Sequence, residues 1–66
     1  MEVFRERLRE ERKKAGYTQE DMGQKLNMTQ SAYAQYETGK TQPSLETTIK
    51  IAEILKISLD YLVGRY

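Results

Sequence analysis

Residues 18–39 read TQEDMGQKLNMTQSAYAQYETG, and this stretch decides the fold. Thr18 and Asp21 have the spacing of a capping box, with Asp in place of the usual Glu or Gln, so a short helix should begin at Thr18. Thr29 is the next residue suited to cap the start of a helix. The helix that it starts should end at Gly39, because glycine tolerates a left-handed backbone. The stretch therefore predicts two short helices in close succession.

The connection between these two helices carries the most information. Asn27 and Met28 leave only a tight turn between a helix that ends near Leu26 and a helix that runs from Thr29 to about Thr38. Asn accepts a left-handed backbone more readily than most residues. Two helices joined by so few residues cannot lie side by side and must cross at a steep angle, which is the geometry of a helix-turn-helix.

Gly23 lies inside the first of these two helices, beside the apolar pair Met22 and Leu26. A glycine in the middle of a helix costs about 1 kcal/mol relative to alanine. It is either a tolerated weakness or a place where another helix crosses so closely that no side chain fits. We favour the second interpretation.

A further helix is expected on the N-terminal side of this pair, over residues 2–15. Its apolar residues recur at spacings near four and seven, which is typical of one stripe of an amphipathic helix. They are Val3, Phe4, Leu8 and Ala15. Gly16 follows as the C-terminal cap.

Two more helices are expected on the C-terminal side. Ser44 follows Pro43 and caps a fourth helix. Its apolar positions at helical spacing are Leu45, Thr48 or Ile49, Ala52 and Leu55. Ser58 caps a fifth helix, which Gly64 ends. The predicted fold class is therefore all-α, a compact domain of five short helices in which the second and third form the helix-turn-helix.

Composition narrows the function classes for this chain of 66 residues. Its 11 Lys and Arg against 10 Asp and Glu leave a formal net charge of +1, which does not by itself argue for a nucleic-acid partner. The absence of Cys and His excludes disulfides, zinc fingers and catalysis by thiol or imidazole. No nucleophile–base pair or carboxylate cluster stands out, so we expect no enzyme activity, cofactor or metal. No apolar run suits a membrane span or a signal peptide, so a cytoplasmic location is the default expectation.

Six pieces of the chain share their order and spacing with a known family. They are GYTQEDM at residues 16–22, Leu26, TQSAY at 29–33, YETGK at 36–40, PSLET at 43–47 and SLDYL at 58–62. Together they resemble the phage repressor and Cro type of helix-turn-helix domain, in the xenobiotic response element family of transcriptional regulators. The resemblance covers roughly residues 8–62. Residues 1–66 are therefore interpreted as one DNA-binding domain, with the helix-turn-helix at 18–37.

The resemblance implies a lambda-repressor-like fold whose third helix enters the DNA major groove while the second lies across the backbone. It implies a sequence-specific regulator of transcription that binds a double-stranded DNA operator, represses, and acts as a homodimer. Such a protein would belong to a bacterium or a phage and work in the cytoplasm, associated with the nucleoid. The alternative is an antitoxin or a protein-interaction module on the same fold. An anti-repressor or a toxin is then a further partner to consider.

The base-reading positions of this family correspond here to Gln30, Ser31 and Gln35. Gln can pair with N6 and N7 of adenine, and each such pair contributes about 1–3 kcal/mol of discrimination between bases. Ser hydrogen-bonds less strictly. Without the resemblance, the same side chains would be interpreted as solvated surface.

The resemblance also implies phosphate contacts from Thr18, Gln19, Thr29 and Lys40. The amides at the start of a helix attract anions, which suits the first three of these positions. Thr18 and Thr29 can also act as caps, worth about 1 kcal/mol each, and the two roles can coexist. Lys40 can equally be an ordinary exposed lysine.

Arg12 and Glu37 match a pair that relatives use to tie the first helix to the third. We expect an ion pair here that fixes the orientation of the third helix rather than adding much net stability. The residues expected in the core, with the tyrosine hydroxyls reaching its rim, are Tyr17, Tyr33, Tyr36, Met22, Leu26 and Leu45. Tyr33 is a possible exception, because its hydroxyl could reach a phosphate.

An apolar surface near the end of the chain suits contact between two copies. Its residues are Ile54, Ile57, Tyr61, Val63 and Tyr66, of which Ile54, Tyr61 and Tyr66 are the expected dimer contacts. Ile57 and Val63 can instead belong to the core. A single third helix in the major groove contacts too few base pairs to single out a site. Pairing of two copies about a two-fold axis doubles the length of DNA that is read.

Overall fold

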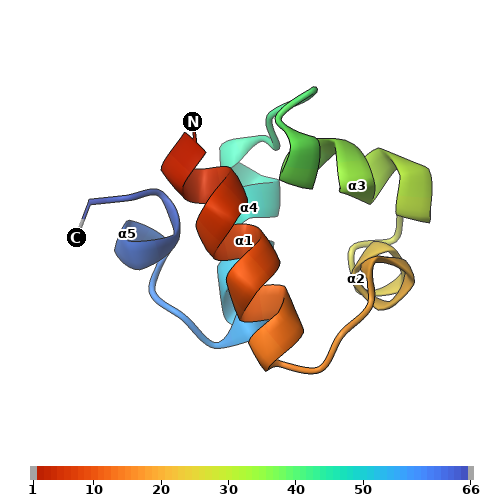
Figure 1. The fold of residues 1–66 in the computed structure, drawn as a ribbon, viewed down its shortest axis with the longest axis horizontal. Helices are drawn as coiled ribbons and strands as arrows, with labels where there is room; N and C mark the ends of the chain where they lie inside the picture. The colour runs from red at the N-terminus through yellow and green to blue at the C-terminus, as the bar shows by residue number, and fades with distance from the viewer. Residues whose placement is uncertain (1, 66) are drawn as a thin grey trace.

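The computed structural model describes residues 2–65 and shows five α-helices and no strand among them (Figure 1). The helices are α1 (Glu2–Lys14), α2 (Gln19–Lys25), α3 (Gln30–Thr38), α4 (Leu45–Leu55) and α5 (Leu59–Leu62). The predicted all-α fold of five helices is confirmed. The bounds agree closely with the sequence pattern, although α1 ends one residue before Ala15.

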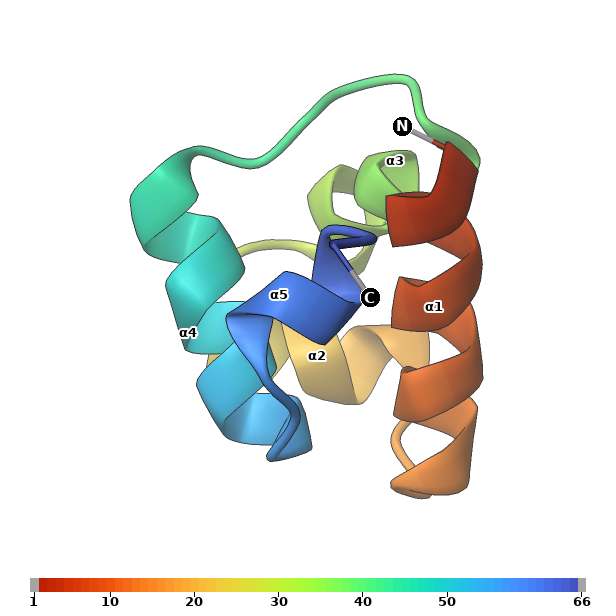
Figure 2. The same ribbon diagram turned by 90° about the vertical axis from the view of Figure 1, so that its left-hand side faces the viewer.

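α1 lies in the middle of the domain and contacts the helices on both of its sides. In Figure 1, α2 and α3 lie on one side of α1, and α5 with the C-terminal end lies on the other. Figure 2, in which the left-hand side of Figure 1 faces the viewer, shows α5 between α1 and α4. α1 contacts both α3 and α5, and α4 contacts α5. No helix within residues 2–65 has the length and apolar content needed to cross a membrane.

The core between these helices is made of aliphatic and aromatic side chains. The buried ones are Phe4, Leu8, Met22, Tyr33, Ile51, Ala52, Leu55 and Leu62. The partly buried ones that pack against them are Tyr17, Leu26, Met28, Tyr36, Ile54 and Ile57. α3 contributes a single fully buried hydrophobic residue, Tyr33. The hydrophobic effect therefore holds α3 less firmly than it holds α1 and α4.

Leu45, Val3 and Ala15 were expected on core-facing positions and are exposed instead, and of the alternatives Thr48 and Ile49 it is Thr48 that is buried. Leu45 is 70%, Val3 43% and Ile49 39% exposed, and Ala15 also lies on the surface. Thr48 takes the buried position in α4, with its hydroxyl donating to the carbonyl four residues earlier at 2.8 Å. The prediction for Leu45 was wrong because helical side chains tilt toward the N-terminus, and in the first turn of α4 this tilt carries the side chain past the end of the core.

Polar side chains begin four of the helices, as the sequence predicts. The hydroxyl of Thr18 accepts from the amide of Asp21 at 3.0 Å, and the Asp21 carboxylate accepts from the amide of Thr18 at 2.8 Å. The capping box with Asp is therefore present. Thr29, Ser44 and Ser58 cap α3, α4 and α5 through their hydroxyl oxygens.

The turn between α2 and α3 folds back tightly onto α2. Asn27 adopts the expected left-handed backbone, with φ 62°. The amide of Met28 donates to the carbonyl of Gly23 at 2.8 Å, and a Cβ added to Gly23 would lie 2.9 Å from the Met28 carbonyl oxygen. The close approach expected at Gly23 exists. The approaching backbone is the turn itself and the cap at Thr29, rather than the body of a crossing helix.

Lys56 ends α4 in a left-handed backbone, with φ 58°. This conformation costs an L-residue roughly 1–2 kcal/mol, whereas glycine adopts it readily. Lys56→Gly should therefore raise the free energy of unfolding by about 1 kcal/mol, and the midpoint of thermal unfolding by about 4–8 °C, as measured by circular dichroism. Lys50→Gly, at an exposed position inside α4, is the control and should lower stability by about 1 kcal/mol. Equal losses in both variants would contradict this explanation.

Candidate nucleic-acid interface

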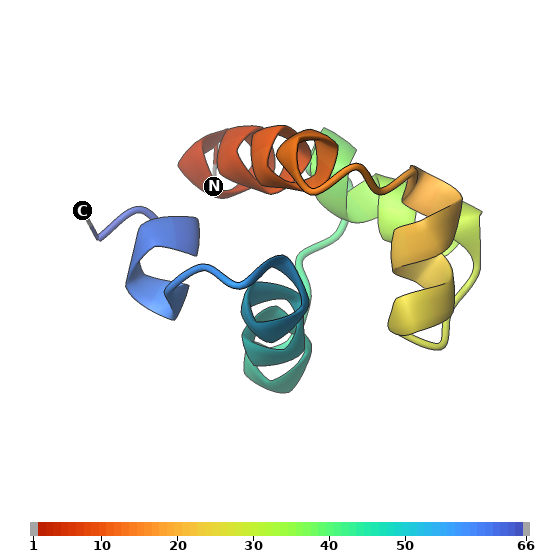
Figure 3. The same ribbon diagram turned by 90° about the horizontal axis from the view of Figure 1, so that it is seen from below.

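α2 and α3 pack against each other and cross at a steep angle. In Figure 1, α2 is seen nearly end-on while α3 lies across the view, and Figure 3 shows the short turn that joins them. The two helices contact each other more extensively than any other pair in the domain. α2 therefore serves as the support against which α3 is placed.

The start of α3 is open to solvent. Gln30 and Ser31 are exposed, and Gln35 is half-buried one turn further along the helix. Within residues 2–65, none of these three side chains makes a hydrogen bond. Their donors and acceptors are therefore available to a ligand that approaches this end of α3.

The four residues predicted to contact phosphate lie at the ends of α2 and α3. Thr18, Thr29 and Lys40 are exposed, and Gln19 is half-buried. The two threonine hydroxyls act as caps, which was one of the two roles considered for them. The Gln19 amide nitrogen donates to a carboxylate oxygen of Glu37 at 3.1 Å.

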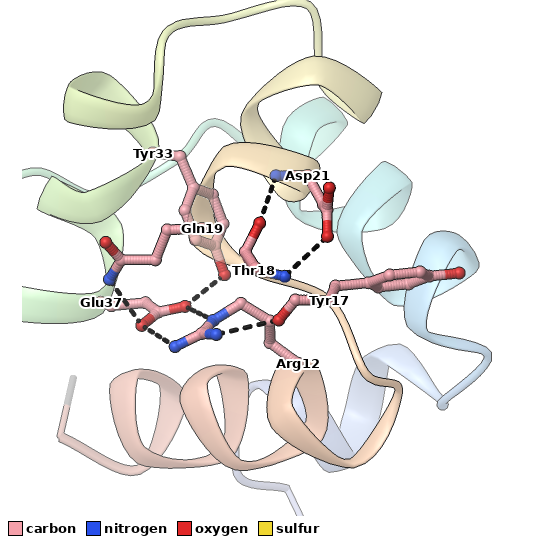
Figure 4. Close-up of polar contacts among 7 residues, drawn as sticks. All are labelled: Arg12, Tyr17, Thr18, Gln19, Asp21, Tyr33 and Glu37. Carbon is pink, nitrogen blue, oxygen red and sulfur yellow. Dashed lines mark hydrogen bonds and ion pairs between the residues drawn. The ribbon is translucent and has the colours of Figure 1, made fainter.

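A buried polar cluster holds α3 against α1 and α2 (Figure 4). Arg12 Nε lies 2.6 Å from Glu37 Oε2, and Arg12 Nη2 lies 3.1 Å from Glu37 Oε1. The Tyr33 hydroxyl donates to Glu37 Oε2 at 2.6 Å, and Gln19 donates to Oε1. Arg12 Nη1 also donates to the carbonyl of Tyr17 at 3.0 Å. The structure therefore brings Arg12 and Glu37 together as an ion pair and adds two further donors to the same carboxylate.

The pKa values in this cluster follow from burial and hydrogen bonding. Burial raises the pKa of Glu37, but the hydrogen bonds from Arg12, Tyr33 and Gln19 outweigh it, so the pKa lies below its ordinary value. The hydrogen bond with Glu37 raises the pKa of Arg12 above its ordinary value. Burial, followed by the Glu37 contact, raises the pKa of the Tyr33 hydroxyl. At neutral pH the carboxylate and the guanidinium are therefore charged, and the phenol is neutral.

The prediction that Tyr33 belongs to the core is confirmed, and the exception considered for it, a hydroxyl that reaches a phosphate, is not what the structure shows. Its side chain is fully buried, and its hydroxyl is used by Glu37. The spacing of Tyr33 and Glu37, four residues apart on one helix, is the sequence signal that indicates this contact. No local signal indicates the contact of Gln19 with Glu37, because it depends on how α2 and α3 cross.

The residues predicted for a dimer contact are less available than the sequence suggests. Ile54 is partly buried against the core. Tyr61 is half-buried, with the guanidinium of Arg7 4.2 Å from its ring centroid and its hydroxyl 3.4 Å from a carboxylate oxygen of Glu11. Tyr66 lies outside the described residues.

Two helices crossing at a short turn, with the second exposed at its start and braced by the first, define a helix-turn-helix domain. The chain belongs to the helix-turn-helix family, whose model matches residues 8–62. This finding confirms the family that the sequence resembles.

Named relatives are regulators of transcription. The chain is 44% identical over 61 residues to the HTH-type transcriptional regulator YqaE of Bacillus subtilis, covering 92% of this chain and 53% of that protein. It is 39% identical over 63 residues to the cryptic phage CTXphi transcriptional repressor RstR of Vibrio cholerae, covering 96% of this chain and 56% of that protein. The chain therefore spans about half the length of the curated relatives that it matches.

A solved structure shares the same arrangement of helices. The P22 c2 repressor, in complex with the synthetic operator 9T, superposes with a TM-score of 0.83 at 31% sequence identity, and the match covers 94% of both chains. The lambda-repressor-like fold inferred from the sequence is thus that of a phage repressor whose structure was solved with its operator.

Glu37 should make the stability of the domain depend on acid pH. Because its pKa is lowered from 4.5 in the folded state, its contribution is complete above that value and is lost as the pH falls through the folded pKa. Glu37→Gln should lower the free energy of unfolding by about 3 kcal/mol at pH 7, since it leaves Arg12 buried without its partner.

The difference between the wild type and Glu37→Gln should shrink as the pH falls below 4.5, as measured by urea unfolding at a series of pH values. The pKa of Asp21 is also lowered, by its hydrogen bonds with the backbone and side chain of Thr18. Asp21 titrates in both proteins and therefore cancels in the difference. A difference that is the same at pH 7 and pH 3 would contradict the assignment.

Proposed function

We propose that this chain is a sequence-specific DNA-binding domain of a transcriptional repressor and that α3 reads bases in the major groove of its operator. Residues 1–66 would form one such domain, with the helix-turn-helix at residues 18–37. The domain would be encoded by a bacterium or a phage and would act on DNA in the bacterial nucleoid. Binding to DNA would require no cofactor and no chemical step.

One observation carries this proposal. The exposed side chains of Gln30 and Ser31 and the half-buried side chain of Gln35 belong to a helix that the buried carboxylate of Glu37 anchors near its C-terminal end. An amide side chain can pair with both N6 and N7 of adenine, provided that its helix is held rigidly at the right depth. The complex of the P22 c2 repressor with an operator supports the same use of this fold.

Contacts to phosphate would set the register of α3 on the duplex. We propose Thr18, Gln19, Thr29 and Lys40 for this role. The amides at the starts of α2 and α3 and the charge of Lys40 suit phosphate oxygens. Two acidic residues in the first turn of α2 oppose this attraction, so non-specific affinity should be modest and should depend weakly on salt.

We propose further that two copies bind together. A single α3 reads only a few base pairs, whereas two copies related by a two-fold axis read two half-sites about 34 Å apart. Ile54, Tyr61 and Tyr66 remain candidates for the contact between copies. Leu45 and Ile49 add exposed apolar surface on α4.

Selection of binding sites from random duplex DNA tests the proposal. The wild type should select inverted half-sites with centres one helical turn, or about 34 Å, apart. Gln30→Ala and Gln35→Ala should each relax the preference at a defined position in both half-sites, with a loss of about 1–3 kcal/mol for the preferred base. Lys40→Ala should instead weaken binding to all sequences about equally.

Gln42→Ala is the matched control, because Gln42 is an exposed glutamine in the loop that follows α3, beyond the end of the helix opposite Gln30. It should leave the selected sequence unchanged. Unaltered preferences in both the Gln30 and the Gln35 variants would remove α3 as the base-reading element. Selection of isolated half-sites would contradict the proposal that two copies bind together.

A further inference from the structure

α1 reaches the C-terminal end of α3 through two arginines that are seven residues apart. Arg12 holds Glu37, as described above. Arg5 lies near the start of α1, and its Nη1 donates to the main-chain carbonyl of Thr38 at 2.9 Å. The two arginines therefore bind consecutive residues at the end of α3.

Arg5 also lies directly over the residue that ends α3. Gly39 has a left-handed backbone with φ 82°, and its amide closes the last turn of α3. A Cβ added to Gly39 would lie 2.6 Å from Cδ and 2.7 Å from Nη1 of Arg5. Gly39 thus allows both the turn and the close approach of the Arg5 side chain.

This contact suits the chemistry of a helix end. The last carbonyls of a helix have no partner inside the helix and carry its partial negative charge. A guanidinium satisfies such a carbonyl and opposes that charge, and its planar donors fix direction as well as distance. Arg5 therefore fixes where the end of α3 lies relative to α1.

The position of the C-terminal end of α3 also determines where its N-terminal end, with Gln30, is placed. Gln30 and Glu37 are separated by about 10 Å along a helix with a rise of 1.5 Å per residue. A tilt of about 10° around Glu37 would move Gln30 by about 2 Å. Hydrogen bonds to base edges tolerate much less than this, because they weaken steeply outside 2.7–3.2 Å.

We propose that Arg5 is a positioning residue for sequence recognition. Together with Arg12 it fixes the tilt of α3 at two points, and it affects the discrimination between DNA sequences without contacting DNA. This inference rests on the proposed function.

Arg5→Met and Arg9→Met form a matched pair that tests the inference. Both remove one positive charge from α1, but Arg9 is exposed, whereas Arg5 binds the end of α3. For each variant, the affinity is measured for the duplex that the wild type selects and for a scrambled duplex, over a range of salt concentrations. The affinities are measured at a temperature at which circular dichroism shows that the wild type and both variants are folded. If Arg5→Met melts too early, Arg5→Gln and Arg9→Gln take the place of the methionine pair.

The ratio of selected to scrambled affinity should fall about fivefold or more for Arg5→Met and change less than about twofold for Arg9→Met. The salt dependence should be the same in both variants. Equal ratios in the two variants would overturn the inference. So would equal weakening of both duplexes by Arg5→Met with a salt slope reduced by about 1, since that would make Arg5 a phosphate contact. A wild type that selects no sequence would instead refute the proposed function.

Discussion

The buried carboxylate of Glu37 is the group on which the exposed position of α3 depends. It accepts two hydrogen bonds from Arg12 and one each from Tyr33 and Gln19, and so joins α1, α2 and α3. An unpaired charge in this place would cost several kcal/mol. The three helices are therefore restricted to an arrangement that supplies all of these donors.

α3 needs polar support because it has little apolar surface to bury. Tyr33 is its only fully buried hydrophobic side chain, and even this residue contributes a hydrogen bond to Glu37. Burial of apolar area stabilises a helix without fixing its direction, whereas hydrogen bonds restrict both distance and angle. The polar cluster thus orients α3 from its C-terminal end, while Gln30 near its start stays exposed and Gln35 half-exposed, as recognition of a duplex by side-chain amides requires.

Local features of this fold are predictable from sequence, and features that depend on packing are not. The caps at Thr18 and Thr29 and the left-handed Asn27 each depend on a few neighbouring residues, so the pattern indicates them correctly. Leu45 was misplaced because an amphipathic stripe does not show how far the neighbouring helices cover it.

The features of the candidate site are likewise predictable from the sequence only in part. The chemistry of Gln suits adenine, but the choice of Gln30 and Gln35 among the glutamines of the chain comes from the family resemblance. The contact of Gln19 with Glu37 and that of Arg5 with Thr38 join residues that no sequence periodicity relates. Only the three-dimensional arrangement of the helices shows them.

The most direct test of the account is an NMR titration that follows the side-chain amide signals of the glutamines as the selected duplex is added. The account predicts that the signals of Gln30 and Gln35 shift or broaden at stoichiometric duplex by more than those of the exposed Gln24 and Gln42. Perturbation of Gln24 and Gln42 with no change at Gln30 and Gln35 would show that the duplex binds another face, and would contradict the central claim that α3 is held outward to read DNA.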